Sequence, residues 1–386
     1  MRPISSSATL HRRCGDRAIY SRASRNRKET AGEEGQNAQI SAGPNLRWQV
    51  PAAFAKTALP MNEQDPPADP VAAPASVPAN VAARYRPADR YGFLAGAGAR
   101  LRYAVWDAPG TPRGTVVVLT GRGEFIEKYA TEIVGELLDR GFAVYALDWR
   151  GQGLSDRPLP DRGKGHIDNF TTYMADLALF LETVVSPAAP RPVLALCHSM
   201  GAHILLRHLA ENGSGPLSAG VFVSPMTALR REAMLRSVLM LMPEVPAVED
   251  RYLFGTGPFV LLAREFASNF VTHDERRYRF TEEWFAADPR LTLGGPTIGW
   301  SRQAIRSMTA ALAPGYLERI DLPLLLITAG EDRLIDPSNH APTVARMRHA
   351  EHFTIGSARH EVMMETDDLR ALFWEAFDRL AKGVLS

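Results

Sequence analysis

The chain has 386 residues, of which 45% are apolar, enough for one large domain or two smaller ones with a sizeable core. Its net charge of +1 argues against nucleic-acid binding, and its two cysteines, Cys14 and Cys197, are too few and too far apart for a disulfide framework. No C-x-x-C or H-E-x-x-H spacing indicates a metal site, and no apolar run approaches the roughly 20 residues that cross a bilayer.

The N-terminal part of the chain lacks a core-forming pattern. The first 60 residues are rich in Ser, Arg, Asn and Gln, without sustained apolar periodicity, and residues 62–80 are rich in Pro and Ala. We therefore expect residues 1–85 to be a disordered extension followed by a linker, and residues 86–386 to form the folded domain. A native start at Met61, preceded by a non-native extension, is an alternative interpretation.

From about residue 100, short apolar runs alternate with amphipathic helical patterns. Strands are expected at residues 101–106, 115–119, 142–147, 192–196, 219–223, 324–328 and 351–355. Helices are expected from residue 124 to about 140, at 173–184, from 201 onward, at 342–347 and at 367–380. Strand, helix and strand at this spacing predict an α/β fold with a mostly parallel sheet and helices on both faces.

Residues 225–316 interrupt this alternation with helical patterns and no convincing strand. An insertion at the C-terminal edge of a parallel sheet lies over the place where such sheets bind ligands, so we expect a helical cap. Its first part, from Leu229 to Met242, is rich in Leu and Met. Ordinary helix packing explains most of these residues, and a soft apolar surface facing a cleft would also suit an acyl chain.

Ser199 lies between an expected strand and an expected helix, within the sequence V-L-A-L-C-H-S-M-G-A-H-I-L-L of residues 193–206. Such a position forces a sharp turn, which lifts the hydroxyl out of the sheet and places it at the positive end of the helix. Gly201 provides the second small residue of a G-x-S-x-G pattern, and Cys197 stands in place of the first glycine. Although a serine between small residues is often structural, this setting favours a nucleophile.

A serine nucleophile requires a base that is itself oriented by a carboxylate. His360 is the expected base because it lies on the loop after the last expected strand. Asp332, on the loop after the preceding strand, is the expected acid. Asp336 lies farther from the strand end and precedes Pro337, as a helix N-cap does, and Glu331 is a third candidate.

Residues 115–148 also suggest a dinucleotide-binding unit, because a strand, glycines, a helix and a second strand ending in aspartate follow one another. However, Glu127 occupies the position of the third glycine, and Glu124 precedes it, so two carboxylates would repel a pyrophosphate. The Tyr-x-x-x-Lys base of a dehydrogenase is missing from the sequence as well. The glycines fit an oxyanion hole better, with the backbone N–H groups of Arg122 and Met200 as donors.

Several motifs follow one another between about residues 98 and 382: L-T-G-R-G-E at 119–124, D-W-R-G-Q-G-L-S at 148–155, the serine turn, G-E-D at 330–332 and H-E at 360–361. Together they resemble the lysophospholipase and monoacylglycerol lipase branch of the α/β-hydrolases, and residues 269–272 and 294–300 resemble the cap of bacterial members. The resemblance implies the α/β-hydrolase fold, the triad Ser199, Asp332 and His360, the oxyanion donors Arg122 and Met200, and no cofactor. Thr120 stands where many relatives have histidine.

We therefore expect a serine hydrolase that cleaves carboxylic esters of single-acyl lipids, either lysophospholipids or monoacylglycerols, through an acyl-enzyme. An apolar cap would bind a long acyl chain with about 0.8 kcal/mol per buried CH₂. Arg230, Arg231 and Arg277 could meet a phosphate, although arginines on a cap surface are more often simply solvated. A hydrolase of small soluble esters and a non-catalytic binding protein of the same fold are the alternatives. The expected location is the cytoplasm, with transient contact between the cap and a membrane surface.

Overall fold

A nine-stranded sheet organises the residues that this computed structural model describes, which are 19–22, 72–96, 98–230, 232–259 and 265–385. Its strands, in chain order, are β1 (Ile19–Arg22), β2 (Arg90–Gly96), β3 (Ala99–Trp106), β4 (Gly114–Leu119), β5 (Phe142–Leu147), β6 (Val193–His198), β7 (Leu217–Val223), β8 (Leu324–Ala329) and β9 (Ala350–Ile355). Their order across the sheet is β1-β9-β8-β7-β6-β4-β5-β3-β2. The strands β4 to β9 pair parallel with one another, whereas β1 pairs antiparallel with β9, and β3 pairs antiparallel with both β5 and β2.

The central strands are apolar throughout because helices cover both faces of the sheet. In β4, Val117 and Leu119 belong to the core formed with α3 (Phe170–Phe180) and α4 (Ser199–Asn212). Val116 and Val118 point to the opposite core, formed with α1 (Ile126–Ala130), α2 (Ile133–Asp139) and α10 (Asp367–Leu385). A π-helical turn, η1 (Leu181–Val185), extends α3, and α9 (His340–Val344) lies between β8 and β9.

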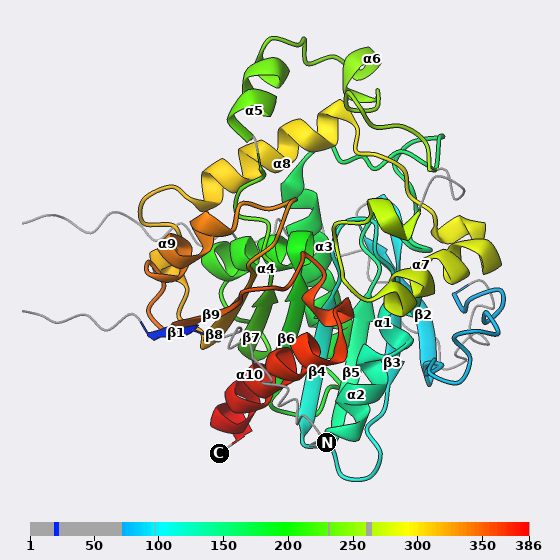
Figure 1. Ribbon diagram of the computed structural model, residues 1–386, viewed down its shortest axis with the longest axis vertical. Helices are drawn as coiled ribbons and strands as arrows, with labels where there is room; N and C mark the ends of the chain where they lie inside the picture. Colours follow the sequence, from blue (N-terminus) through cyan, green and yellow to red (C-terminus); the bar gives the residue numbers. More distant parts are fainter. Residues whose placement is uncertain (1–18, 23–71, 97, 231, 260–264, 386) are drawn as a thin grey trace, which may run out of the picture. The chain divides into compact units, whose positions relative to one another are not determined.

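A helical cap follows β7. It contains α5 (Glu232–Met240), α6 (Pro246–Glu249), η3 (Phe266–Ser268), α7 (Glu275–Ala287), η4 (Pro289–Leu291) and α8 (Ile298–Ala311), with η5 (Leu317–Arg319) leading back to β8. The described residues of 225–316 form isolated bridges but no strand. Figure 1 shows α5, α6 and α8 grouped at one end of the sheet. The expected α/β fold with a helical cap is therefore confirmed.

Two expectations need correction. The sequence interpretation missed β2, which pairs with β3 along its full length. The expected boundary at residue 86 is also misplaced, because Val81 and Tyr85 are buried and the Tyr85 ring lies 5.0 Å from that of Trp284. Within the expected disordered extension, the structure describes residues 19–22 as strand β1, and residues 1–18 and 23–71 lie outside the described part.

The described helices include none with both the length and the apolar character needed to cross a bilayer.

Candidate active site

The turn between β6 and α4 presents Ser199. Its φ of 48° lies in the left-handed region, which is strained for a residue other than glycine and is typical of functional turns. A side chain at position 201 would place Cβ 2.5 Å from the carbonyl oxygens of Leu119 and Thr120, so Gly201 is required for the close approach of β4 and α4. Cys197, in place of the first glycine, is fully buried.

The structure brings the three expected catalytic side chains together. The Nε2 atom of His360 lies 3.0 Å from Oγ of Ser199, and Nδ1 of His360 lies 2.6 Å from Oδ2 of Asp332. All three residues are buried. The second oxygen of Asp332 accepts hydrogen bonds from the backbone N–H groups of Leu334 and Ile335, at 2.8 and 3.0 Å. The carboxylate is thus fixed in orientation, with one oxygen directed to the imidazole.

The environment of Asp332 also favours its ionised form. Burial alone would raise the pKa of this carboxyl, but the hydrogen bond and charge of His360, together with the two backbone N–H groups, lower the pKa below its ordinary value. Asp336 instead accepts from the backbone N–H of Ser338 at 3.1 Å and caps η6 (Pro337–Asn339), as its sequence context indicated. Glu331 is exposed and lies 3.5 Å from Nε2 of His273.

The loop after β4 is held on both sides of Arg122. The backbone N–H of Gly121 donates to Oε2 of Glu124, and the N–H of Gly123 donates to Oε1 of Gln152 at 2.7 Å. The Gln152 amide in turn donates to the carbonyl of Gly121 at 3.1 Å. Because β4 and β6 are neighbours, this loop and the N-terminal turn of α4, which contains Met200, lie at the same edge of the sheet.

A buried ionic cluster connects this loop with His360, and the sequence interpretation did not anticipate this cluster. Nδ1 of His198 lies 3.0 Å from Oε2 of Glu124, while Nε2 of His198 lies 3.2 Å from the carbonyl oxygen of His360. The Lys128 ammonium donates to Glu124 and to Glu361, at 2.8 Å in both cases. The spacing of four residues between Glu124 and Lys128 was the available signal, although in the structure Glu124 precedes α1.

The charged groups of this cluster stabilise each other's ionised forms, as their pKa shifts show. Burial alone would raise the pKa of Glu124, but His198 and Lys128 lower it well below its ordinary value. Burial alone would lower the pKa of His198, but the Glu124 carboxylate raises it. The cluster therefore holds the loop after β4, the residue before Ser199 and the residue after His360 in one network of charged hydrogen bonds.

Asp148, which suggested dinucleotide binding, and Glu127, which argued against it, both have a structural role. Arg102, which is fully buried, pairs with Glu127 and with Asp148, each at 2.7 Å. Asp148 also accepts from the backbone N–H groups of Ile126 and Leu154. Since this arginine neutralises both carboxylates inside the core, neither is available to a ribose.

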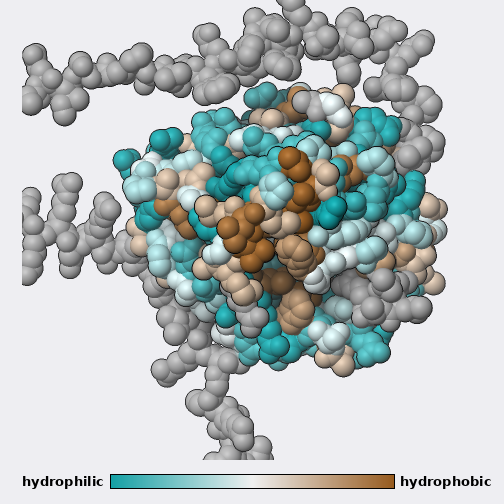
Figure 2. Space-filling model, turned by 90° about the horizontal axis from the view of Figure 1, so that it is seen from above, coloured by the Kyte–Doolittle hydropathy of each residue, from teal (hydrophilic) through white to brown (hydrophobic). Residues whose placement is uncertain are grey.

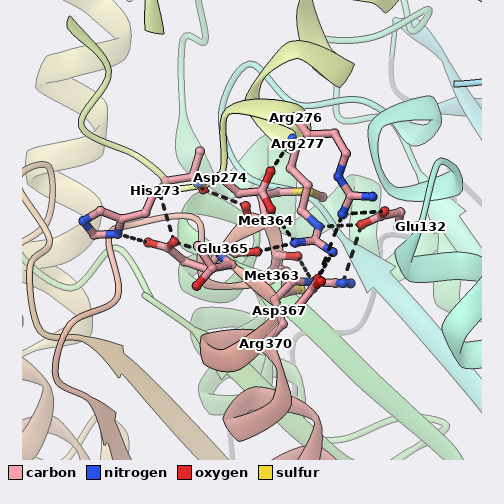
Figure 3. Close-up of polar contacts among 12 residues, drawn as sticks. Glu132, His273, Asp274, Arg276, Arg277, Met363, Met364, Glu365, Asp367 and Arg370 are labelled. Carbon is pink, nitrogen blue, oxygen red and sulfur yellow. Dashed lines mark hydrogen bonds and ion pairs between the residues drawn. The ribbon is translucent and has the colours of Figure 1, made fainter. Parts of the chain in front are cut away.

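Figure 3 shows the polar contacts that fasten the cap to the segment after His360. The buried carboxylate of Glu365 accepts from the backbone N–H of His273 at 2.9 Å and from that of Arg359 at 2.8 Å. Arg277 of α7 pairs with Glu132 at 2.6 Å, and with Asp274 and Asp367 as well. The guanidinium of Arg277 is thus committed to ion pairs and does not meet the expectation of a phosphate contact.

The other two arginines considered for a phosphate lie near the acid or outside the described residues. Arg230 is exposed and donates from Nε to the carbonyl oxygen of Asp332 at 2.8 Å. It lines an open cavity of about 740 Å³ with Glu331, Asp332 and Arg333. Arg231 is one of the residues that the structure does not describe.

Comparison with known proteins identifies the family. The model of the Hydrolase_4 family, described as serine aminopeptidase, S33, matches residues 110–367. The chain belongs to this family. It is 34% identical over 267 residues to lysophospholipase L2 of Escherichia coli (strain K12), a match that covers 67% of this chain and 77% of that protein. It is also 30% identical over 293 residues to the monoacylglycerol lipase of Mycolicibacterium smegmatis, covering 72% of this chain and 91% of that protein.

Solved structures agree on the fold of this Hydrolase_4 member. A thermostable carboxyl esterase from Bacillus coagulans, solved in complex with glycerol, superposes with a TM-score of 0.62 at 18% identity, covering 78% of this chain and 100% of that one. Family, relatives and fold together make the protein a carboxylic ester hydrolase of the α/β-hydrolase type, similar to lysophospholipases and monoacylglycerol lipases.

Proposed function

We propose that this protein is a serine hydrolase of single-acyl lipid esters, with Ser199 as nucleophile, His360 as base and Asp332 as the acid that orients the base. One observation carries the proposal: a continuous chain of hydrogen bonds runs from the buried Asp332 through His360 to Ser199. Ser199 begins α4 directly after β6, Asp332 and His360 lie on loops after β8 and β9, and the three converge at one edge of the sheet. This arrangement has the geometry that activates a serine hydroxyl.

The proposed reaction proceeds through an acyl-enzyme. Oγ of Ser199 attacks the ester carbonyl carbon while Nε2 of His360 accepts its proton, and the backbone N–H groups of Arg122 and Met200 bind the oxyanion. The carbon–oxygen bond to the alcohol then breaks, and His360 gives its proton to the leaving oxygen. Water then attacks the acyl carbonyl carbon while Nε2 of His360 accepts a proton from it. The bond between this carbon and Oγ of Ser199 breaks, His360 returns the proton to Oγ, and the carboxylic acid is released. Asp332 remains ionised and stabilises the imidazolium.

The relatives and the cap support a single-acyl lipid as the substrate. The curated relatives include a lysophospholipase and a monoacylglycerol lipase, whose names imply an ester with one acyl chain. In this chain the cap exposes large apolar residues at Met234, Met240, Leu241 and Phe254, and Leu241 keeps 87% of its surface exposed. Figure 2 shows apolar side chains gathered on the cap face. An exposed patch of this kind suits transient contact with a lipid surface, and the cytoplasmic location stays a prediction.

The substrate class is tested by kcat/KM for monoacylglycerols and lysophospholipids of graded acyl length, below their micelle-forming concentrations. We expect kcat/KM to rise with chain length, because each buried CH₂ contributes about 0.8 kcal/mol. An aminoacyl arylamide is the control substrate, since the family description is that of an aminopeptidase. A steady fall with chain length would instead indicate a hydrolase of small soluble esters.

The lipid contact of the cap is tested separately by sedimentation with phospholipid vesicles. Replacing Met240 and Leu241 by serine should weaken vesicle binding, while hydrolysis of a short soluble ester continues. Equal binding by the variant and the original protein would contradict a role for this patch. Ser237→Ala, on the same helix, serves as the control because its side chain is exposed and polar.

A further inference from the structure

The side chain of Arg122 lies beneath the cap. Its Nη2 atom donates to the carbonyl oxygen of Gly294 at 2.9 Å, and its guanidinium lies 5.2 Å from the centroid of the Trp300 ring. A Cβ at position 165 would come within 2.3 Å of Nη2, so Gly165 gives the guanidinium its space. The Nε atom is buried and has no hydrogen-bond partner among the described residues.

Arg122 also lacks a carboxylate partner within the part of the chain that the structure describes. Seven buried cations of the described residues each form an ion pair with at least one carboxylate, whereas the half-buried Arg122 and Arg157 form none there; the seven are Arg102, Lys128, Arg150, Arg207, Arg277, Arg302 and Arg370. Burial lowers the pKa of Arg122 to about 10, because it disfavours the charged guanidinium. An unpaired cation in a protein interior is costly and is typical of a site that receives an anion.

Arg157 provides a comparison, because its guanidinium also lacks a carboxylate partner within the described residues. Burial lowers its pKa to about 10 as well. However, its two Nη atoms donate to the backbone carbonyl oxygens of Gly151, Gly153, Arg290 and Thr292, and only its Nε, like that of Arg122, lacks a partner among the described residues. The guanidinium of Arg122 donates to a single backbone carbonyl, that of Gly294, and its other N–H groups can donate to a further acceptor.

The guanidinium of Arg122 belongs to the same residue as one of the proposed oxyanion donors. The backbone N–H of Arg122 is the proposed oxyanion donor. The preceding residue, Gly121, lies close to His198, the residue before Ser199, because a Cβ at position 121 would lie 2.9 Å from Nδ1 of His198. The aliphatic stem of the arginine separates this N–H from the guanidinium. In a lysophospholipid, the glycerol backbone separates the ester carbonyl from the phosphate by a comparable span. In a monoacylglycerol, a neutral hydroxyl takes the place of the phosphate.

We propose that the Arg122 guanidinium binds the phosphate diester of the head group, so that the site prefers lysophospholipids to monoacylglycerols. This inference rests on the proposed function. An ester carbonyl held by the Arg122 N–H places the phosphate near Nε and Nη1, and a phosphate oxygen accepts charge-assisted hydrogen bonds from a guanidinium fork. The cation then gains the counter-charge that the described residues do not supply.

The first test compares kcat/KM for a lysophospholipid and a monoacylglycerol with the same acyl chain. The original protein should prefer the lysophospholipid. Arg122→Met should lower the ratio of the two kcat/KM values by about tenfold or more, the effect of losing a charged hydrogen bond, and Arg122→Lys should lower it less. Both rates falling by the same factor in Arg122→Met would overturn the proposal, because the side chain would then serve only to anchor the loop to Gly294. A preference of the original protein for the monoacylglycerol would overturn it too.

The second test measures binding without turnover. In the Ser199→Ala protein, calorimetry compares a lysophospholipid whose ester is replaced by an ether with the matching alkylglycerol. Adding Arg122→Met should raise Kd for the phospholipid ether about tenfold relative to Kd for the alkylglycerol. An unchanged ratio of the two Kd values would overturn the proposal. Since this readout does not involve hydrolysis, it remains decisive if the original protein cleaves neither lipid, an outcome that would contradict the proposed function itself.

Discussion

The carboxylate of Asp332 and the imidazole of His360 meet at 2.6 Å, although 28 residues separate them in the chain. Asp332 follows β8 and His360 follows β9, and these two strands are parallel neighbours in the sheet. Since the carboxyl ends of parallel strands lie at one edge, the topology brings the two loops together. The same edge receives Ser199 from the end of β6.

Replacement of the acid tests this relationship. Asp332→Asn should lower kcat by about 10⁴-fold, because the amide no longer holds the imidazole in the required tautomer. Asp336→Asn is the matched control, since Asp336 caps η6 and does not contact His360. Its kcat should change far less. A larger loss of kcat in Asp336→Asn than in Asp332→Asn would show that the acid is misassigned.

Gly201→Ala should disturb the loop after β4, which carries the proposed oxyanion donor Arg122. The added Cβ would lie 2.5 Å from the carbonyl oxygens of Leu119 and Thr120, so β4 and α4 must move apart. We expect kcat for ester hydrolysis to fall by about 10²-fold, the effect of losing one oxyanion donor. Gly383→Ala, in α10, is the control because its Cβ meets open space. Equal kcat values for the two variants would contradict the close approach.

Removal of one charge from the buried cluster should destabilise the protein. Glu124→Gln keeps the size of the side chain but leaves His198 and Lys128 without their shared carboxylate. The free energy of unfolding, measured with urea, should fall by about 3–5 kcal/mol. Asp107→Asn is the control, because the exposed pair of Asp107 and Arg90 should contribute no more than about 1 kcal/mol. If both variants lost the same stability, the cluster would be energetically unimportant.

Buried histidines predict how stability depends on pH. Burial lowers the pKa of His203 to about 3, of His208 to about 4 and of His340 to about 4, because it disfavours the charged imidazole. In the unfolded chain these groups bind protons near pH 6.5, whereas in the folded chain they do not until about pH 4. Their contribution is therefore present at neutral pH and is lost as the pH falls, by about 1.4 kcal/mol per pH unit for each histidine well below pH 6.5.

His198 acts in the opposite direction, because its pKa is raised and its protonation accompanies folding. Burial also lowers the pKa of His352, whereas it raises the pKa of Asp148 to about 6, so that Asp148 acts in the same direction as His198. Since four histidines oppose these two groups, the free energy of unfolding should fall between pH 7 and pH 5. Urea titrations at several pH values measure this slope, and His208→Gln should reduce it. Stability that is constant or increases over this range would contradict the burial of these imidazoles.

The sequence predicts the central strands and the nucleophile turn because local chemistry determines them. The runs at β4 and β5 are apolar since both faces are covered, and that pattern is visible without the fold. The edge strand β2 lacks such an apolar run, because only its Leu94 is buried. Gly92 further weakens its strand pattern, and the structure explains this glycine: a Cβ there would meet the Tyr103 ring across the β2–β3 pair.

The pairing within the site is less visible in the sequence. Ser199, Asp332 and His360 could be selected because each follows an expected strand. The link between Glu124 and His198 depends on the register of β4 against β6, which no local pattern specifies. The packing of Val81 and Tyr85 was missed for a similar reason, since two apolar residues in a Pro- and Ala-rich segment acquire partners only in the folded domain.

The most direct test of the proposed function is labelling with a fluorophosphonate, followed by mass spectrometry of the modified peptide. We expect one phosphonate on Ser199, with loss of ester hydrolysis in proportion to labelling, and no adduct in Ser199→Ala. Ser224 is the internal comparison, because it is the other described non-glycine residue with a positive φ and its hydroxyl is buried without a partner among the described residues. An adduct on Ser224, or ester hydrolysis retained by Ser199→Ala, would contradict the role of Ser199.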